Sequence, residues 1–209
     1  MADNRGRRVG LTRDSILTAA VELADSEGLA AVSMRRLAAH LDVEAMTLYH
    51  YVPSKAALHD GMVEHVITLV DVPFDALPWS EALHAYAMSL LSALGAHPGV
   101  ISLLATRPAL TPRTKVILEA ALESLQNGGV PPTTGLAMVQ TLTALAVGHA
   151  RTDHEFPAAA DTEALISVDH GAHPLLAEAI TSRQQPEDFF GSLVDTVIAG
   201  FAARLEHER

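Results

Sequence analysis

An all-α protein is the fold class that this sequence predicts. Apolar residues make up 49% of the 209 positions but aromatic residues only 4%, so Ala and Leu must fill most of the core. These two residues favour helices over strands. No segment alternates apolar and polar residues in the manner of a strand, and proline or glycine marks most breaks between helical patterns.

Four helical patterns occupy the first seventy residues. They are expected at about 13–27, 34–41, 44–51 and 55–70. Three of them follow residues that favour an N-cap, namely Thr12, Ser33 and Ser54. Gly28 is the expected C-terminal stop of the first helix, and Asp42 lies in a tight turn before the third.

A proline-rich linker at 71–78 leads into a second group of helices. These are expected at 79–96, 98–105, 111–127, 132–152, 173–184 and 187–206. Residues 153–172 lack a clear period and are predicted to form a loop. We therefore expect a domain at 1–53 and a larger domain at 54–209, joined by the helix at 54–70.

Charge divides the chain near the same boundary. The net charge is −11, yet residues 1–55 carry seven Lys or Arg and seven Asp or Glu. Residues 56–209 carry seven bases and eighteen acids. An acidic domain repels phosphate, so we expect the two parts to bind different partners.

Several classes of protein are disfavoured by the composition. The chain has no cysteine, which fits a reducing cytosol and excludes disulfides and thiolate metal sites. Its N-terminus has no apolar h-region of a secretory signal, and no apolar run approaches the ~18 residues of a membrane span. We expect a cytoplasmic protein without a membrane partner.

Residues 33–51 have the spacing of a helix-turn-helix motif. Leu37 and Leu41 face inward from its first helix, Ala38 permits close helix approach, and Leu48 anchors its second helix. At ~100° per residue, the opposite side of the second helix carries Ala45, Met46, Tyr49 and His50. Methyl and thioether groups suit thymine methyls, and tyrosine hydroxyls reach phosphates, so this face suits DNA. A plain helical core is the alternative.

The segment SMRRLAAHLDVEAMTLYHYVPSKAALHDGMV closely resembles the DNA-binding domain of the tetracycline-repressor (TetR) family. The residues that match in order and spacing are Arg35, Leu37, Ala38, Leu41, Val43, Thr47, Leu48, Tyr49, Val52 and Lys55. A weaker resemblance extends to the last helix. Asp42 departs from the family, which usually has glycine in this turn, but Asp tolerates the left-handed conformation better than most residues.

The resemblance implies roles for the residues of this motif. Base readers would be Arg35, Ala45 and Met46, and phosphate contacts would come from Ser33, Thr47, Tyr49, Tyr51 and Lys55. His50 occupies a position where relatives often carry a wedged aromatic side chain, so packing and DNA contact are both open. For Arg5, Arg7 and Arg8, a DNA-binding arm and a solvated tail are both open.

Two segments of the acidic domain suit a dimer interface. Ala137, Thr141, Ala144 and Gly148 form a stripe of small residues, and the last helix is apolar over much of its circumference, so it must be covered on both sides. The family forms a four-helix interface from such segments. The resemblance thus implies a homodimer through helices near 132–152 and 187–206, matched to a palindromic DNA operator. A monomer with core helices is the alternative.

The resemblance also implies an effector pocket in the acidic domain. Alignment of the ATRP stretch at 105–108 places six residues at pocket-facing positions, namely Tyr86, Leu90, Leu103, Thr106, Met138 and His149. Leu103 replaces a histidine that helps the tetracycline repressor bind the magnesium of the drug complex. We therefore expect an apolar, aromatic or amphipathic effector and no cofactor.

The eleven histidines form no compact metal-ligand set, and no nucleophile is paired with a base, so neither a metal site nor an enzyme is expected. The sequence predicts a ligand-responsive transcriptional regulator, a repressor that binds a palindromic operator as a homodimer and is released by a small-molecule effector. Two alternatives stay open. One is a DNA-binding regulator without small-molecule sensing, and the other is a helical ligand-binding protein with a vestigial motif.

Overall fold

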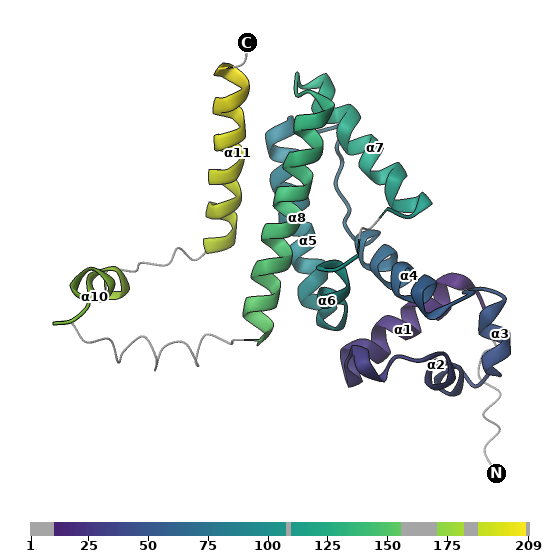
Figure 1. Cartoon of the computed structure of the whole chain (residues 1–209). Coiled ribbons are helices and arrows are strands. Elements are labelled where there is room, and N and C mark those ends of the chain that lie inside the picture. The colour runs from purple at the N-terminus through teal and green to yellow at the C-terminus, as the bar shows by residue number, and fades with distance from the viewer. Residues whose placement is uncertain (1–10, 108–109, 156–170, 182–187, 208–209) are drawn as a thin grey trace. The chain divides into compact units, whose positions relative to one another are not determined.

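The computed structural model describes residues 11–107, 110–155, 171–181 and 188–207, and every regular element within them is a helix (Figure 1). The predicted all-α fold class is confirmed. Two compact units divide the chain: Met1–Leu69 with Gly99–Lys115, and Val70–Pro98 with Val116–Arg209. The predicted boundary after residue 53 divides the chain by function, and it stays a prediction. The compact units divide the chain at other positions, because the first unit also holds α4 (Lys55–Ile67).

The first unit is built from short helices. Besides α4 it contains α1 (Arg13–Glu27), the 3₁₀ turn η1 (Leu29–Ala31), α2 (Met34–His40), α3 (Ala45–Tyr49) and α6 (Ile101–Leu104). The turn η1 was not predicted, and α4 ends three residues before the predicted Val70.

Local hydrogen bonds explain why these helices begin where they do. The side chains of Thr12, Ser33 and Ser54 accept hydrogen bonds from backbone N–H groups three residues later, at 3.1, 3.2 and 3.1 Å, so all three predicted N-caps are confirmed. Gly28 ends α1 with a φ of 82°, and Asp42 adopts the left-handed conformation with a φ of 55°.

One apolar core holds the first unit together. Its fully buried side chains come from α1, α2, α3 and α4 and include Ile16, Leu17, Leu37, Leu48, Leu58 and Met62. Packing of α1 on α4 is close at Gly61, where a Cβ atom would lie 2.5 Å from Leu17 Cδ2. The short α3 therefore rests on a rigid base through Leu48.

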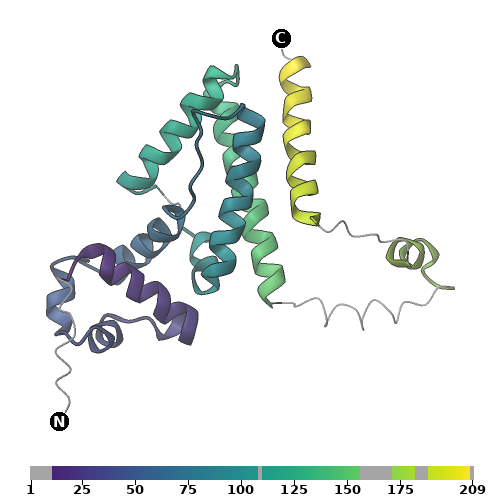
Figure 2. The same ribbon diagram turned by 180° about the vertical axis from the view of Figure 1, so that it is seen from behind.

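The second unit contains α5 (Trp79–Ala96), most of α7 (Pro112–Asn127), α8 (Pro132–Glu155), α10 (Pro174–Thr181) and α11 (Phe189–His207). The turn η2 (Pro98–Val100) follows α5. α5, α8 and α11 run side by side, as the opposite view confirms (Figure 2). Their contact buries Leu83, Leu90, Met138, Leu142 and Val194.

The predicted loop at 153–172 is wrong at its beginning, because α8 continues to Glu155. Residues 156–170 lie outside the described residues, as do the expected arm of Arg5, Arg7 and Arg8 and residues 182–187 at the predicted ends of the last two helices. No single described helix is long and apolar enough to cross a membrane; by length and composition alone, Trp79–Ala96 and Pro98–Leu104 together pass that test.

Candidate functional site

The outer face of α3 exposes large apolar and aromatic side chains. Met46 is 69% exposed, Tyr49 42% and Tyr51, just beyond the helix, 39%. Leu48 on the other side of the helix is completely buried. The side chains at the exposed positions therefore do not form a core, and a short helix that presents them to water offers a surface for a partner.

The other predicted DNA contacts come from α2 and its N-cap, from α3 and the residue after it, and from the beginning of α4. Ala45 and Thr47 are half-buried, whereas Arg35, His50 and Lys55 are exposed. Because His50 is exposed, it does not fill a wedge beside the helix in this structure. The half-buried Ser33 uses its hydroxyl to cap α2 by accepting from the backbone N–H of Arg36.

Of the seven Lys and Arg side chains that the structure describes in the first unit, four form ion pairs with carboxylates. The pairs are Arg13–Glu64, Arg36–Glu27, Arg107–Asp60 and Arg113–Asp14. Arg35 and Lys55 take part in none of the pairs within the described residues. Among the described residues Lys115 on α7 is unpaired as well, but only Arg35 and Lys55 belong to the motif and to the beginning of the helix that follows it, where a cation can meet phosphate or a guanine edge.

Four of the predicted effector residues belong to the second unit. The hydroxyl of Tyr86 on α5 is 2.7 Å from Thr143 Oγ1 on α8, and burial raises the pKa of Tyr86. Leu90 and Met138 are completely buried, and the His149 ring is centred 4.9 Å from that of Phe190. The interior between α5 and α8 thus combines apolar surface with one polar pair.

The remaining two predicted effector residues, Leu103 and Thr106, belong to the first unit. Leu103 is buried, and the exposed Thr106 directs its hydroxyl to the Ser102 carbonyl oxygen of its own helix turn. Sequence reasoning missed Phe74, whose ring lies 6.5 Å from Tyr86, and Thr143. No signal in the sequence set Thr143 apart, because α8 contains five threonines.

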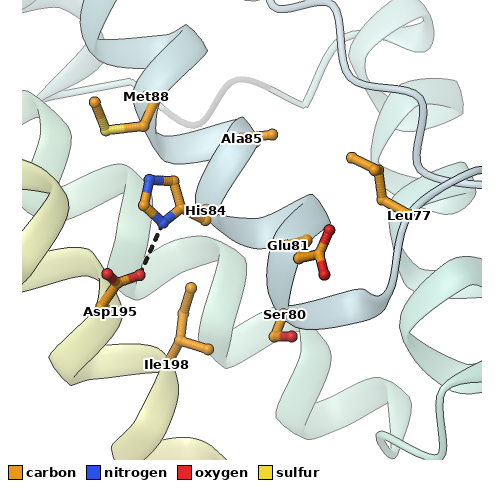
Figure 3. A pocket seen from close by; sticks show the side chains of 8 residues that line it. All are labelled: Leu77, Ser80, Glu81, His84, Ala85, Met88, Asp195 and Ile198. Atoms are coloured by element: carbon orange, nitrogen blue, oxygen red, sulfur yellow. Dashed lines mark hydrogen bonds and ion pairs between the residues drawn. The ribbon is translucent and has the colours of Figure 1, made fainter.

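A surface pocket of about 520 Å³ lies between the beginning of α5 and α11 (Figure 3). It is lined by Leu77, Ser80, Glu81, His84, Ala85, Met88, Asp195 and Ile198. His84 Nδ1 lies 2.8 Å from Asp195 Oδ1 across it. None of the six predicted effector residues lines this pocket. Within the part of the chain that the structure describes, no group of three or more His, Asp or Glu side chains is arranged to hold a metal ion.

Two family models match the chain. Residues 16–62 match "Bacterial regulatory proteins, tetR family", and residues 73–205 match "Tetracyclin repressor-like, C-terminal domain". The HTH-type transcriptional repressor DrrR1 of Streptomyces coeruleorubidus is 31% identical over 90% of this chain and 73% of its own length. The tetracycline repressor protein class E of Escherichia coli is 29% identical over 95% and 94%.

Solved structures agree with these relatives. ActR from Streptomyces coelicolor in its apo form has a TM-score of 0.78 and 27% identity, over 95% of this chain and 98% of ActR. Its complex with (S)-DNPA has a TM-score of 0.79 and 27% identity, over 93% and 98%. Its complex with actinorhodin has a TM-score of 0.75 and 28% identity, also over 93% and 98%. The chain therefore belongs to the tetR family of bacterial regulatory proteins, which are transcriptional regulators and not enzymes.

Proposed function

We propose that this regulator is a ligand-responsive repressor that acts in the cytoplasm, binds a palindromic operator as a homodimer and is released by a small-molecule effector. The observation that carries the proposal is the exposed face of α3. Exposure of Met46, Tyr49 and Tyr51 to water is unfavourable, and contact with a DNA major groove removes part of this apolar surface from water. Arg35, Ala45 and Met46 read bases, and Ser33, Thr47, Tyr49, Tyr51 and Lys55 hold the backbone. His50, being exposed, joins this DNA surface.

Dimerisation is supported by two exposed stripes of small residues. On α8 the stripe is Ala137, Thr141, Ala144 and Gly148. On α11 it is Ser192, Thr196, Ala199, Gly200 and Ala203. A Cβ atom at Gly148 or Gly200 would meet nothing within 4 Å in the single chain. Small exposed residues along two neighbouring helices let a second copy approach closely, and a two-fold dimer matches a palindrome.

The effector that we propose is an aromatic or amphipathic molecule without a magnesium ion. ActR has been solved in complex with (S)-DNPA and with actinorhodin, so one relative of this chain binds small molecules. In this chain, Tyr86 and Thr143 offer a polar pair amid the buried Leu90 and Met138. We assign His149 of the same unit to this effector site. Leu103 and Thr106, which belong to the first unit, stay effector contacts that only the resemblance to the family implies.

The test begins with selection of bound duplexes from a random DNA pool. We expect one palindromic sequence to be enriched, and fluorescence anisotropy to give specific binding by two chains per duplex. Actinorhodin is the first effector to test for release. Failure to enrich any sequence would leave a ligand-binding protein with a vestigial motif. Binding that no compound in a panel of aromatic molecules reverses would favour a regulator without small-molecule sensing.

A further inference from the structure

The pocket between the beginning of α5 and α11 has no part in the proposed function. Its volume of about 520 Å³ lies within the range of roughly 300–1,000 Å³ that small-molecule sites occupy. All eight residues that line it belong to the second unit, so the pocket is formed within one compact unit. It can therefore be considered as a binding site separate from the effector site proposed above.

The helix α5 presents different sides to the two sites. Glu81, His84 and Met88 recur at steps of three and four residues, so they share the side of the helix that lines the pocket. Tyr86 follows His84 by two residues and Leu90 follows Met88 by two, which places each of them ~200° around the helix. A ligand in the pocket would thus lie on the side of α5 that faces away from the proposed effector contacts.

Apolar side chains from both helices and from the linker line the pocket. Met88 and Ala85 on α5 and Leu77 before it are half-buried, and Ile198 on α11 is 7% exposed. Contact with the apolar part of a small molecule would remove this surface from water. Such a molecule would touch α5 and α11 at the same time.

The polar groups of the pocket are mainly hydrogen-bond acceptors. Figure 3 shows His84 and Asp195 pointing toward one another. An ionised carboxylate only accepts, so His84 donates from Nδ1 to Asp195 at 2.8 Å, and its neutral ring offers Nε2 as an acceptor. Glu81 is exposed one turn before His84 and forms no ion pair within the described residues. These groups suit a ligand that donates from N–H and carries a positive charge.

The charge around the pocket has the same sign. Among the residues that the structure describes, no Lys or Arg side chain lines it, and acids outnumber bases in the second unit as a whole. The negative potential of such a surface attracts cations and repels anions. An acid such as Glu81 is also favoured in the first turn of any helix by the helix dipole. The experiment below therefore separates binding at Glu81 from general acidity.

We propose that the pocket between α5 and α11 binds an amphipathic amine. The protonated amino group donates to the Glu81 carboxylate and to His84 Nε2, and the apolar body covers Met88 and Ile198. This site goes beyond the proposed function, since it takes a cation at a place that none of the predicted effector residues lines.

The experiment follows the methionine methyl groups of the full chain by NMR, with isotope label in these groups. Met88 lines the pocket, whereas Met138 is buried between α5 and α8 among the proposed effector contacts. The probes are phenethylamine, phenethyl alcohol and phenylacetate, which share an aromatic body and differ in charge. We expect phenethylamine to shift the Met88 resonance saturably and to leave that of Met138 in place. It should bind about threefold or more tightly than the alcohol, and phenylacetate should bind most weakly.

Variants test which groups bind the amine. Glu81→Gln should weaken phenethylamine binding by about threefold or more and leave the binding of phenethyl alcohol unchanged. Glu123→Gln is the matched control, because it removes one exposed carboxylate of the same unit outside the pocket and should change neither affinity. Ala85→Phe should fill the pocket and block both probes, and an unchanged Met138 resonance shows that this variant is folded.

Four results would overturn the inference. They are a Met88 resonance that no amine concentration shifts saturably, a shift of Met138 instead of Met88, equal affinity for phenethylamine and phenylacetate, and equal losses in Glu81→Gln and Glu123→Gln. The measurement contains no DNA. A failure to select an operator would therefore count against the proposed function and leave this test of the pocket intact.

Discussion

Met46 is the most exposed of the large apolar side chains on α3, and it carries no charge. Its thioether can contribute to specificity only through base edges, whereas phosphate contacts need a donor. We expect Met46→Ala to change the base preferred at one position in each half-site while the salt dependence of binding stays unchanged. Selection from a random pool with both proteins checks this. An identical preferred sequence would show that Met46 lies outside the groove.

Lys55 is expected to act differently, because it is exposed at the beginning of α4 and pairs with no carboxylate among the described residues. Lys55→Ala should weaken binding to every sequence alike. It should also reduce the slope of log affinity against log salt by about 1. Anisotropy titrations on operator and random duplexes at several salt concentrations measure both effects. A loss confined to the operator would contradict a phosphate role.

His59 gives the first unit a pH dependence. Burial lowers its pKa below 6.5, with Lys55 and Arg107 contributing more than the opposing charge of Asp60. Its Nε2 atom is buried and has no hydrogen-bond partner in the described structure. Below about pH 6.5 the His59 imidazole is protonated in the unfolded chain while it stays neutral in the folded chain. The free energy of unfolding therefore falls as the pH drops below about 6.5.

Chemical denaturation across pH checks this expectation, and His59→Gln should remove the loss between about pH 6.5 and the lowered pKa of His59. Hydrogen bonding and the charges of nearby arginines, Arg13 among them, outweigh burial and lower the pKa of Glu64 on α4. The stability that Glu64 contributes is therefore also lost as the pH falls, but below 4.5. A stability that is flat down to pH 5 in the wild type would contradict the assignment to His59.

Residue exposure on α3 could be predicted from sequence, whereas the burial of Glu64 on α4 and its pairing with Arg13 could not. The helical repeat of ~100° per residue separates Leu48 from Met46 without knowledge of the fold. Glu64 on α4 accepts a hydrogen bond from Arg13 on α1, which lies 51 positions away in the sequence. Periodicity carries no information about such distant pairing.

At the scale of helices, the close approach of α1 and α4 depends on Gly61. A methyl group there would lie 2.5 Å from Leu17 Cδ2, and Leu17 is buried and cannot move aside freely. Gly61→Ala should destabilise the protein by about 1–3 kcal/mol. Gly95→Ala, in the last turn of α5 with nothing within 4 Å of its Cβ, should be neutral or stabilise by up to about 1 kcal/mol. Denaturant unfolding of the two variants compares them, and equal effects would contradict this packing.

The ends of helices were predictable only where a local signal sets them. Thr12, Ser33 and Ser54 cap helices with bonds to the next turn, so a short window of sequence contains both partners. The continuation of α8 to Glu155 had no such signal, because a solvated helix end needs no apolar period. The early end of α4 is likewise not encoded in its apolar pattern, which continues to Val70.

At the scale of the whole molecule, the proposed dimer makes the exposed stripe of α8 sensitive to size and charge. Ala144→Arg should leave the secondary structure intact, because the side chain points to solvent in the single chain. It should convert the dimer to a monomer and weaken operator binding by at least about tenfold. Analytical ultracentrifugation and anisotropy check both effects, with Ala120→Arg on the exposed side of α7 as a control. A dimeric Ala144→Arg variant would place the interface elsewhere.

The division of charge between the two compact units has a kinetic consequence. The first unit carries ten Lys and Arg against nine Asp and Glu, while the second carries four against sixteen. Attraction to random DNA is then weak, because few cations are available to release counterions and the acidic unit repels the duplex. We therefore expect this protein to leave non-specific DNA quickly and to reach its site through repeated encounters from solution, with little sliding along the DNA.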